Sequence, residues 1–557
     1  MIKTIKLKFG RVSGSAPEKI ATTPVTVFVG PNNSGKSKAL AEINYYCSTG
    51  QRNTTDVILD SIEFDTFTTE IAEEKIKKVT LEPNLSDGHL LDDHIIVGKK
   101  GQRNQVPRQA LLDALQNTNS QTQLFCRWYL ASNTLILDGR SRINLIGQQN
   151  AGDLQHQPQT SFQVLFCDNA KRKEVRRVIH DAFGTYFVID PTSLGQLRLR
   201  LALRPPTTDM EERGIHDEAV RFQAEAFLVE QASDGVKAFT GIITEIIAGD
   251  PAIVLIDEPE AFLHPSLSFK LGKEIASSSL GSEKRLFVST HSPDFVMGCI
   301  HSGAPVNIVR LTYRSEVATA RILSNTDILH LMRNPLLRST GVLGGLFYEF
   351  VIVTESDADR AFYQEINERL LRYKPELGIP NCLFLNAQNK QTVHVIIKPL
   401  RELGIPAVGI VDVDILKEGG QPWTNFLKGG FMPELEHQSL AALRSCVKQK
   451  IDATGKDMKQ NGGVDILSDS DKEAVNNLFD KLDEYGLFAV RKGELESWLS
   501  FLGVTGHTPK WLINIFEKMG EDPDSPDYLK PSDDDVWLFL GEIKKWFTNP
   551  NRKGIPS

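Results

Sequence analysis

Residues 30 to 37 read Gly30-Pro31-Asn32-Asn33-Ser34-Gly35-Lys36-Ser37, and this stretch decides the fold of the N-terminal half. It follows a short β-branched run, residues 25–29, and precedes a helical run, residues 38–43, which is the setting of a phosphate-binding loop. Its glycines let backbone N–H groups converge on anionic oxygens at a helix N-terminus. We expect Lys36 to reach the β- and γ-phosphates of ATP and the Ser37 hydroxyl to bind Mg²⁺.

Two further strands end in polar residues that suit the same site. Residues 253–256 are apolar and lead into Asp257 and Glu258. This pattern predicts Asp257 in the Mg²⁺ shell and Glu258 as the residue that polarises the attacking water. Residues 286–288 form another strand, which leads to His291. A lone His at a strand end is usually structural, but its place after the carboxylate strand predicts a contact with the γ-phosphate.

A second alternation of strands and helices begins at Phe350 and predicts a separate, small parallel-sheet domain. The expected strands are residues 351–354, 383–385 and 407–411, and the expected helices are residues 359–371 and 392–403. The polar, acidic stretches 452–471 and 521–535 are typical of loops or linkers.

Acidic residues follow the strands of this second domain. They are Glu355, Asp359, Asp412, Asp414, Glu494 and Glu496. A strand period of two places Asp412 and Asp414 on one side of a strand end, where like charges repel and favour a cation between them. The set predicts an oxygen-only site for Mg²⁺ or Mn²⁺. Two such ions can activate water and stabilise the leaving oxygen in phosphodiester hydrolysis.

Structural explanations exist for some of these acids. Asp359 starts an amphipathic helix, where the helix dipole favours an acid whether or not a metal binds. A surface turn can also hold a pair such as Asp412 and Asp414, although the apolar strand before it favours an ordered pocket. Glu355 is harder to explain as structure, because it ends a run that reads as a buried strand.

Composition limits the classes of protein that remain. A chain of 557 residues, 41% hydrophobic, is expected to form two or more domains. With 63 Lys+Arg against 71 Asp+Glu, the net charge is -8, so a nucleic-acid surface must be a local patch. The six scattered cysteines disfavour a zinc site or a disulfide framework. The sequence shows neither a signal peptide nor a membrane span, so we expect a cytoplasmic protein that does not contact membranes.

Two basic stretches are candidates for such a patch. Residues 171–179 combine apolar residues at helical spacing with cations on the other face, a pattern that is usually a solvated surface. Arg198, Arg200 and Arg204 add cations along an alternating strand. A basic groove without sequence specificity is therefore retained as a hypothesis.

At residues 257–265, Asp-Glu-Pro-Glu-Ala-Phe-Leu-His-Pro, the chain resembles the ABC ATPases, in particular their OLD and RecF/SMC-like branch. These residues look like that branch's joined Walker B and D-loop. Ala232-Ser233-Asp234-Gly235 lies where the signature motif would be, although it departs from Leu-Ser-Gly-Gly-Gln. The resemblance implies that Ser233 and Gly235 of one subunit complete the ATP site of another, which requires a homodimer or a higher oligomer. The Q-loop glutamine is not identified.

The C-terminal half resembles a Toprim domain, and the order of the two halves resembles the OLD-family nucleases, including Gabija-type and retron-associated defence nucleases. On this resemblance Glu355 matches the first Toprim glutamate, although Ser356 stands where Gly is usual. The Asp412–Asp414 pair and the Glu494–Glu496 pair match the two later acidic pairs. Lys390 would then be a candidate contact for phosphate. OLD nucleases also use a late lysine, for which Lys510 is the candidate and Lys492 the alternative.

The expected fold class is α/β. Residues 1–345 are predicted to form an ABC/AAA-type ATPase domain, with a partly helical insertion, a candidate for dimerisation, within about 100–230. Residues 346–557 are predicted to form a Toprim nuclease domain with a helical C-terminal part. No internal repeat is visible.

The resemblance implies an ATP-regulated, metal-dependent endonuclease that cleaves or nicks DNA in prokaryotic antiphage defence. Two alternatives stay open. One is a Toprim ribonuclease acting on tRNA or other RNA, because a metal site recognises a phosphodiester and not a sugar. The other is a regulatory ATPase whose second domain mainly binds nucleic acid or a partner. A retron reverse transcriptase with its RNA and DNA, or a second protein, would be a compatible partner.

Overall fold

The structure is a computed structural model, and it describes residues 1–84, 87–98, 103–139, 141–314, 316–323, 325–339 and 341–556. The chain divides into two compact units, unit 1 (Met1–Asp327) and unit 2 (Ile328–Ser557). This division falls earlier in the chain than the boundary that we expected after residue 345. The expected start of the insertion, near residue 100, lies outside the described residues.

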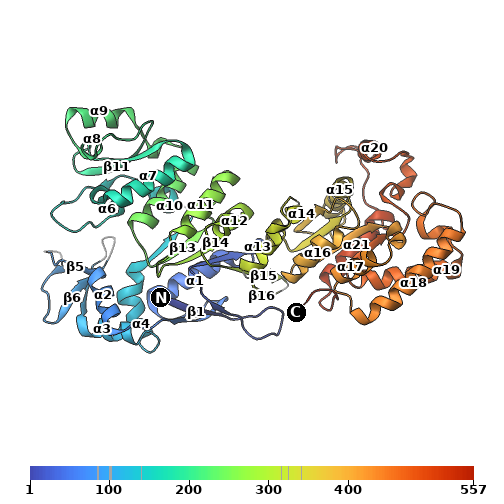
Figure 1. Cartoon of the computed structure of the whole chain (residues 1–557), viewed down its shortest axis with the longest axis horizontal. Coiled ribbons are helices and arrows are strands. Elements are labelled where there is room, and N and C mark those ends of the chain that lie inside the picture. The colour runs from blue at the N-terminus through green and yellow to red at the C-terminus, as the bar shows by residue number, and fades with distance from the viewer. Residues whose placement is uncertain are drawn as a thin grey trace. The chain divides into compact units, whose positions relative to one another are not determined.

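Unit 1 is built on a six-stranded sheet in the order β16-β15-β3-β14-β13-β8 (Figure 1). The strands are β3 (Val25–Val29), β8 (Thr134–Leu137), β13 (Ile253–Asp257), β14 (Arg285–Ser289), β15 (Val306–Arg314) and β16 (Val317–Leu323). All neighbours pair in parallel except β16, which runs antiparallel to β15. Because β3, β14 and β13 are parallel neighbours, the residues that follow them meet at one edge of the sheet.

Helices cover this sheet. They include α1 (Lys36–Thr49), α10 (Asp234–Ala248), α11 (Pro265–Ser277) and α12 (Pro293–His301). Helix α1 contacts β13 and β14, and α11 packs against α12. Apart from a terminal residue of β13 and of β14, strands β3, β13 and β14 are buried throughout. Continuous apolar runs of this kind are what a parallel strand needs when helices exclude water from it.

Three smaller sheets complete unit 1, in the orders β2-β1-β4, β5-β6-β7 and β10-β11-β12, with β9 paired to β11. Their strands are β1 (Ile2–Leu7), β2 (Lys19–Ala21), β4 (Leu59–Phe64), β5 (Thr80–Leu81), β6 (His94–Val97), β7 (Asn104–Pro107), β9 (Gln149–Asn150), β10 (Tyr186–Asp190), β11 (Gln196–Ala202) and β12 (Phe227–Leu228). The helices here are α2 (Thr69–Val79), α3 (Arg108–Gln116), α4 (Thr122–Phe125), α5 (Ser141–Asn144), α6 (Ser161–Cys167), α7 (Asn169–Phe183), α8 (Asp209–Arg213) and α9 (Asp217–Glu225).

The range 100–230, which we expected to be a partly helical insertion, is therefore mixed α and β. It also contributes β8 to the main sheet, where β8 pairs with β13. A strand of four residues between polar segments gives too short a pattern to distinguish it from a loop.

Unit 2 contains a four-stranded, all-parallel sheet in the order β18-β17-β19-β20. The strands are β17 (Phe350–Thr354), β18 (Cys382–Asn386), β19 (Ala407–Asp412) and β20 (Leu487–Val490). The helices are α13 (Asn325–Arg333), which begins before the division between the units, α14 (Pro335–Ser339), α15 (Asp357–Tyr373), α16 (Val393–Glu402), α17 (Gln421–Gly429), α18 (Glu434–Ala453), α19 (Asp469–Asp483), α20 (Lys510–Met519) and α21 (Asp535–Thr548). One apolar cluster joins β17, β19 and β20 to α15, α20 and α21.

The strands and helices predicted from residue 351 to residue 411 are all found in unit 2. The carboxyl ends of β17, β19 and β20 lie at one edge of its sheet because the strands are parallel. None of the helices in the described part of the chain is long and apolar enough to cross a membrane.

Candidate nucleotide site and metal centre

The loop between β3 and α1 has the backbone that phosphate binding needs. Gly35 caps α1 in the left-handed conformation, with φ 95°, and a Cβ there would lie 2.7 Å from the Ile58 side chain. Gly30 has φ 144°, and a Cβ there would lie 2.0 Å from the Leu311 carbonyl oxygen. Only glycine fits both positions, so the sequence builds a tight turn that ends in the free N–H groups of a helix N-terminus.

Lys36 and Ser37 begin α1 and point their polar atoms back toward the loop and the sheet edge. The buried Lys36 ammonium donates to the carbonyl oxygens of Gly30, at 2.9 Å, and Pro31, at 2.8 Å. The Ser37 hydroxyl donates to Asp257 Oδ1 at 2.8 Å. Burial lowers the pKa of Lys36 to about 8, opposed by the charges of Glu258 and Asp257. A hydroxyl and a carboxylate in contact at this point fit an Mg²⁺ ion between them and a nucleotide.

Glu258 and His291 lie at the ends of neighbouring strands, and their side chains approach each other. His291 Nε2 is 3.7 Å from Glu258 Oε1, and half of the Glu258 side chain is exposed. Burial lowers the pKa of His291, and the charge of Lys36 lowers it further, so the imidazole is neutral near pH 7. Glu258 itself has φ 49°, a left-handed backbone that is uncommon outside glycine. The predicted partners Asp257, Glu258 and His291 therefore meet at one sheet edge.

Two charged residues of this site were not identified from the sequence. Glu260 accepts a hydrogen bond from the His291 backbone N–H at 2.7 Å, and burial raises its pKa. Arg142 is fully buried and donates to the Glu258 carbonyl oxygen. Glu260 could have been found inside the motif 257–265, whereas no motif surrounds Arg142.

Ser233 and Gly235 lie at the start of α10. Ser233 is the N-cap residue and is exposed, with no side-chain hydrogen bond to the helix, and Gly235 is buried. The structure contains one copy of the chain, so the predicted contact of Ser233 and Gly235 with another subunit remains a prediction. The exposed hydroxyl of Ser233 is available for such a contact.

The metal centre predicted for unit 2 has an acidic core. Glu355, Asp412 and Asp414 each offer a carboxylate oxygen, and the three oxygens lie within 4.8 Å of one another. Glu355 Oε1 also accepts the Asp412 backbone N–H at 2.8 Å. Asp414 Oδ1 is buried and has no hydrogen-bond partner in the described part of the chain. A buried, unpartnered carboxylate oxygen in a three-carboxylate cluster fits a divalent cation.

Asp412 and Asp414 do not come together through the strand periodicity that we expected. Asp412 is the last residue of β19, whereas Asp414 lies in a 3-10 helix, Val413–Lys417. The tight turn of the 3-10 helix brings the second carboxylate back toward the first. The juxtaposition was thus predicted correctly, but its geometric cause was not.

Burial raises the pKa of Glu355, and the charge of Asp412 raises it further. Burial likewise raises the pKa of Asp412, opposed by Lys459. Protons are therefore held by this site at pH values where exposed carboxyls are ionised. A bound cation would favour the ionised forms instead.

Two lysines contact the acidic core. Lys390 Nζ is 2.7 Å from Asp414 and 3.4 Å from Glu418. Lys459 Nζ is 2.6 Å from Asp412, 3.4 Å from Glu494 and 4.0 Å from Asp414. We had predicted Lys390 as a phosphate contact, whereas Lys459 falls in the stretch 452–471 that we took for a loop or linker. No motif surrounds Lys459.

The remaining predicted acids lie around this core. Asp359 forms a capping box with Ser356 at the start of α15, so the structural explanation for Asp359 is confirmed. Burial raises the pKa of Asp359, and the charge of Glu496 adds to that. Glu494 caps a 3-10 turn, Leu495–Ser497, and Glu496 accepts the Thr508 N–H at 3.0 Å. Glu494 is linked to the acidic core through Lys459, which pairs with both Glu494 and Asp412.

The two lysines proposed from the resemblance are not the ones in ion pairs with Asp412 and Asp414 in the described residues. Lys492 pairs with Asp535 at 2.7 Å. Lys510 begins α20 and is exposed. In the described part of the chain, the lysines in ion pairs with the acidic core are Lys390 and Lys459. The role of Lys510 stays a prediction.

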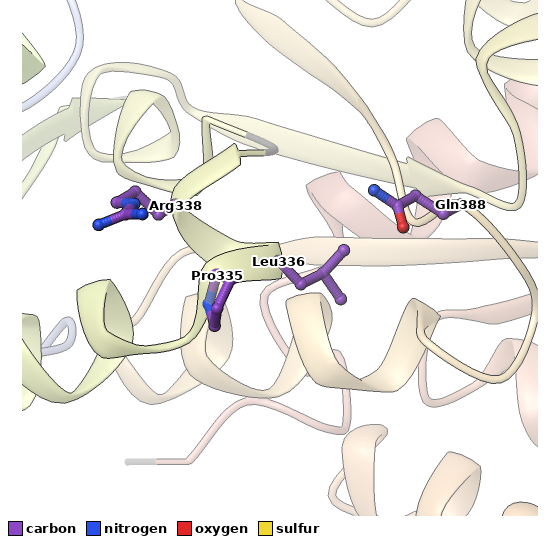
Figure 2. A pocket seen from close by; sticks show the side chains of 4 residues that line it. All are labelled: Pro335, Leu336, Arg338 and Gln388. Atoms are coloured by element: carbon purple, nitrogen blue, oxygen red, sulfur yellow. The ribbon is translucent and has the colours of Figure 1, made fainter.

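A pocket of about 500 Å³ lies in unit 2 between α14 and the loop after β18 (Figure 2). Pro335, Leu336 and Arg338 line it on the helix side, and Gln388 lines it on the loop side. Figure 2 shows Leu336 pointing into the gap toward Gln388. Gln388 and Lys390 belong to the same loop, so this pocket adjoins the segment that contacts Asp414.

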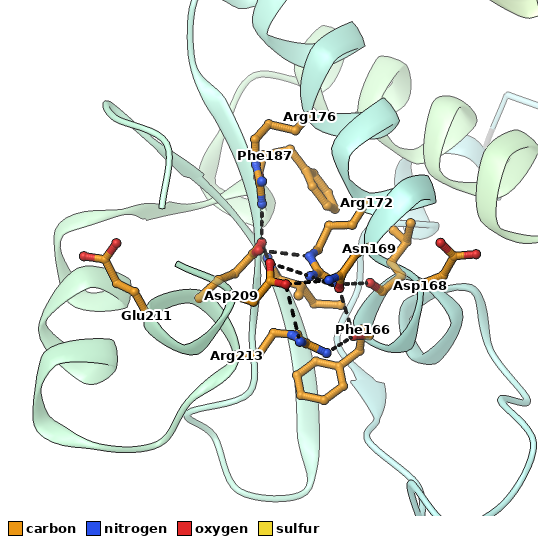
Figure 3. A network of polar contacts seen from close by, with 12 residues as sticks. Phe166, Asp168, Asn169, Arg172, Arg176, Phe187, Asp209, Glu211 and Arg213 are labelled. Carbon is orange, nitrogen blue, oxygen red and sulfur yellow. Dashed lines mark hydrogen bonds and ion pairs between the residues drawn. The ribbon is translucent and has the colours of Figure 1, made fainter. Parts of the chain in front are cut away.

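The basic stretches of unit 1 do not form the free basic groove that we hypothesised. Arg172 is fully buried and pairs with the equally buried Glu212 at 2.9 Å, and Arg176 pairs with Glu212 at 2.6 Å. Figure 3 shows how the arginines of this network converge on oxygens of the chain. Arg198 and Arg200 both pair with one residue, Asp190, and Arg204 pairs with Glu211. These arginines satisfy carboxylates of the chain itself, which a sequence pattern cannot reveal.

Residues 193–297 match a family model described as AAA domain, putative AbiEii toxin, Type IV TA system. The matched range contains Asp257, Glu258 and His291, and it lies wholly in unit 1. Unit 1 therefore contains an AAA-type ATPase domain. ATP is accordingly the nucleotide of its P-loop.

Several solved structures are similar to the chain. An Smc head bound to the C-winged helix domain of ScpA has 15% identity and a TM-score of 0.33, over 58% of this chain and 98% of that one. The Thermotoga maritima SMC head has 13% identity and a TM-score of 0.29, over 58% and 99%. The cbiO1 protein of Clostridium perfringens has 12% identity and a TM-score of 0.27, over 60% and 94%. Likenesses this weak carry no information about function. None of the curated proteins matches the chain.

Proposed function

We propose that this chain is an ATP-regulated, divalent-metal-dependent endonuclease that cleaves or nicks DNA. The observation that carries the proposal is the cluster of Glu355, Asp412 and Asp414, whose carboxylate oxygens lie within 4.8 Å of one another at strand ends of one parallel sheet. Three carboxylates so close repel one another and favour a bound cation, and sets of oxygen ligands suit Mg²⁺ or Mn²⁺. The resemblance to Toprim domains of OLD-family nucleases supports the same assignment and suggests a role in prokaryotic antiphage defence.

In this proposal Glu355, Asp412 and Asp414 hold the metal, and Asp359, Glu494 and Glu496 complete the acidic site. Divalent ions in such sites activate water and stabilise charge on the oxygens of a phosphodiester. The unpartnered Asp414 Oδ1 is an available ligand atom.

Lys390 and Lys459 would contribute positive charge next to the scissile phosphate. Both lysines already lie against acidic side chains of the site, so a metal that takes over those carboxylates releases the ammonium groups for phosphate oxygens. The pocket lined by Arg338 and Gln388 offers a guanidinium and an amide for phosphates farther along the same DNA strand.

ATP would act through unit 1. Lys36 and Ser37 bind the phosphates and Mg²⁺, Asp257 completes the Mg²⁺ shell, and Glu258 polarises water. The exposed Ser233 at the start of α10 supports a site completed by a second copy of the chain. Closure of such a dimer would then control access to the nuclease, and a partner such as a retron reverse transcriptase or a second protein would act at the same step.

A Mn²⁺ titration followed by electron paramagnetic resonance tests the metal assignment without relying on catalysis. The wild-type chain should bind Mn²⁺ at unit 2. Asp412→Asn should weaken this binding at least about 10-fold, because loss of even an outer-shell partner of a metal site costs about 10–100-fold in affinity. Asp257→Asn in both proteins removes the carboxylate proposed for the Mg²⁺ shell of the nucleotide site, which is the competing location for the ion. Asp452→Asn, at an exposed acid in unit 2 that pairs with Lys448, is the matched control and should bind normally. Equal binding by the Asp412→Asn variant would contradict the proposal.

A further inference from the structure

One buried cation of unit 1 has no place in the function described so far. Arg142 lies in α5, just after β8, which is the parallel neighbour of β13. Only 2% of the residue is exposed, and arginine is almost never fully buried unless it is paired. Its Nη1 donates to the Glu258 backbone carbonyl, and its buried Nε has no hydrogen-bond partner in the described part of the chain.

The contact with Glu258 falls on a strained point of the backbone. Glu258 has φ 49°, in the left-handed region. Its N–H donates to the Ser289 carbonyl at 2.9 Å, and its carbonyl accepts the Ala261 N–H at 3.1 Å in addition to the Arg142 guanidinium. A non-glycine residue stays in this conformation only when its surroundings hold it there. The Arg142 side chain holds the Glu258 carbonyl group in this conformation.

The surrounding charges explain why an arginine can be buried here. Asp257, Glu258 and Glu260 all interact electrostatically with Arg142 and oppose the effect of burial, which lowers the pKa of the guanidinium. Glu260 Oε2 is itself buried without a hydrogen-bond partner in the described residues. The sheet order is β3-β14-β13-β8, so β8 and β3 lie on opposite sides of β13. Arg142, which follows β8, supplies positive charge to the acidic end of β13 from one side. The P-loop lysine follows β3 and lies on the other side.

The same residue also touches the helix that begins with the predicted signature residues. Helices α5 and α10 pack together, and a Cβ on Gly241 of α10 would lie 3.0 Å from the Arg142 carbonyl oxygen. Only a small residue at position 241 allows this approach. Arg142 therefore connects α10, through its own backbone, to the Glu258 carbonyl, through its side chain.

We propose that Arg142 is a positioning residue for ATP hydrolysis: by binding the Glu258 carbonyl it fixes the left-handed turn and so aims the Glu258 carboxylate at the attacking water. The inference rests on the role proposed for Glu258 in unit 1. It does not depend on the metal centre of unit 2, so it stands or falls separately from the nuclease.

A double-mutant cycle with Glu258 tests this role. Arg142→Met should lower kcat for ATP hydrolysis about 10²-fold, the effect expected when a catalytic group is displaced by about 1 Å, while the Kd for a fluorescent ATP analogue stays unchanged. Arg142→Lys keeps a donor and a charge and should recover part of kcat. The double variant Arg142→Met, Glu258→Gln should hydrolyse ATP no more slowly than Glu258→Gln alone, because residues that act as a unit are not additive.

A merely structural arginine would give a different pattern. Loss of ATP affinity together with kcat, or additive effects in the double variant, would overturn the proposal, as would an Arg142→Met variant with wild-type kcat. If Arg142→Met fails to fold, the cycle of Arg142→Lys with Glu258→Gln provides the same comparison. Thermal unfolding of each variant identifies those in which the fold is intact.

Discussion

At the scale of single residues, burial sets the protonation of the acidic core. Glu355 directly follows the buried strand β17, and its carboxyl lies beside those of Asp412 and Asp414. Burial raises the pKa of Glu355 to about 8 in the absence of metal, whereas a glutamate of an unfolded chain titrates near about 4.3. Protons and metal ions therefore compete for the same oxygens, and metal binding should release protons.

This shift makes stability depend on pH with a defined sign. Between about pH 4.3 and pH 8 the folded chain holds the Glu355 proton and the unfolded chain does not, so the free energy of unfolding falls as pH rises through this window. Without metal, the stability of the wild type relative to Glu355→Gln should therefore decrease from pH 5 to pH 8. Thermal unfolding of both proteins in the presence of a chelator, at several pH values, measures this difference in stability. A relative stability that rises with pH would mean that the carboxyl is ionised in the fold.

Substitutions at Lys36 and Asp412 should separate ATP binding from the proposed nuclease activity. Lys36→Ala removes the ammonium that lies against the P-loop carbonyls, so binding of a fluorescent ATP analogue should be lost, while Asp412→Asn should bind it normally. Lys38→Ala, on the exposed face of the same helix, is the matched control. Normal ATP binding by the Lys36→Ala variant would show that the loop does not bind phosphate.

The residues found by sequence share one property: each follows an apolar strand directly or stands in a motif. Asp257, Asp412 and the P-loop were predictable for that reason. Arg142 and Lys459 were not, because they reach their sites from segments distant in sequence through side-chain length alone. In the hypothesised basic groove, Arg172 and Arg200 pair instead with Glu212 and Asp190, partners that depend on the fold and not on the local sequence.

At the scale of secondary-structure elements, the buried contacts of Glu212 hold α7, α8 and β10 together. Glu212 accepts from Arg172, Arg176 and the Ile189 N–H, and so it ties α7 and α8 to β10. Glu212→Gln removes the buried counter-charge of Arg172, whose other acidic partner, Asp209 at 3.5 Å, is exposed. The substitution should cost about 3–5 kcal/mol of the free energy of unfolding.

The matched control for this prediction lies on α7, the helix that carries Arg172. Glu174 pairs with Arg177 at 2.8 Å, and each side chain is nearly half exposed. Glu174→Gln should therefore cost less than about 1 kcal/mol. Urea unfolding of unit 1, followed by circular dichroism, compares the two variants. Equal losses would mean that the buried pair is not a structural brace.

Local sequence patterns predicted whether most segments form helices or strands, but not which strands lie next to each other in a sheet. The first nine residues alternate apolar and basic side chains, a pattern typical of an edge strand. They form β1, which is however the central strand of its sheet. Its exposed Lys3 and Lys6 suggested an edge, whereas pairing with β2 and β4 depends on residues far along the chain. The short strand β8 was not predicted for a related reason, since only its pairing with β13 distinguishes it from a loop.

At the scale of the whole molecule, the chain joins a unit that contains an AAA-type ATPase domain to a second α/β unit with its own acidic centre. If the predicted dimer forms through Ser233, ATP should promote association of Glu258→Gln, in which hydrolysis is slowed. Ser233→Arg places a bulky cation at this exposed position and should prevent that association, as measured by sedimentation velocity with and without ATP. ATP-dependent dimers of the Ser233→Arg variant would exclude this surface as the contact.

The most direct test of the central claim is metal-dependent cleavage. Purified protein is incubated with supercoiled plasmid and, separately, with tRNA, under Mg²⁺ or Mn²⁺, with and without ATP, beside Asp412→Asn and the control Asp452→Asn. The account predicts nicking or cutting of the plasmid that requires metal, is lost in Asp412→Asn and persists in Asp452→Asn. Plasmid cutting that survives in Asp412→Asn would contradict the assignment of the metal centre, and cleavage of tRNA alone would make the enzyme a ribonuclease.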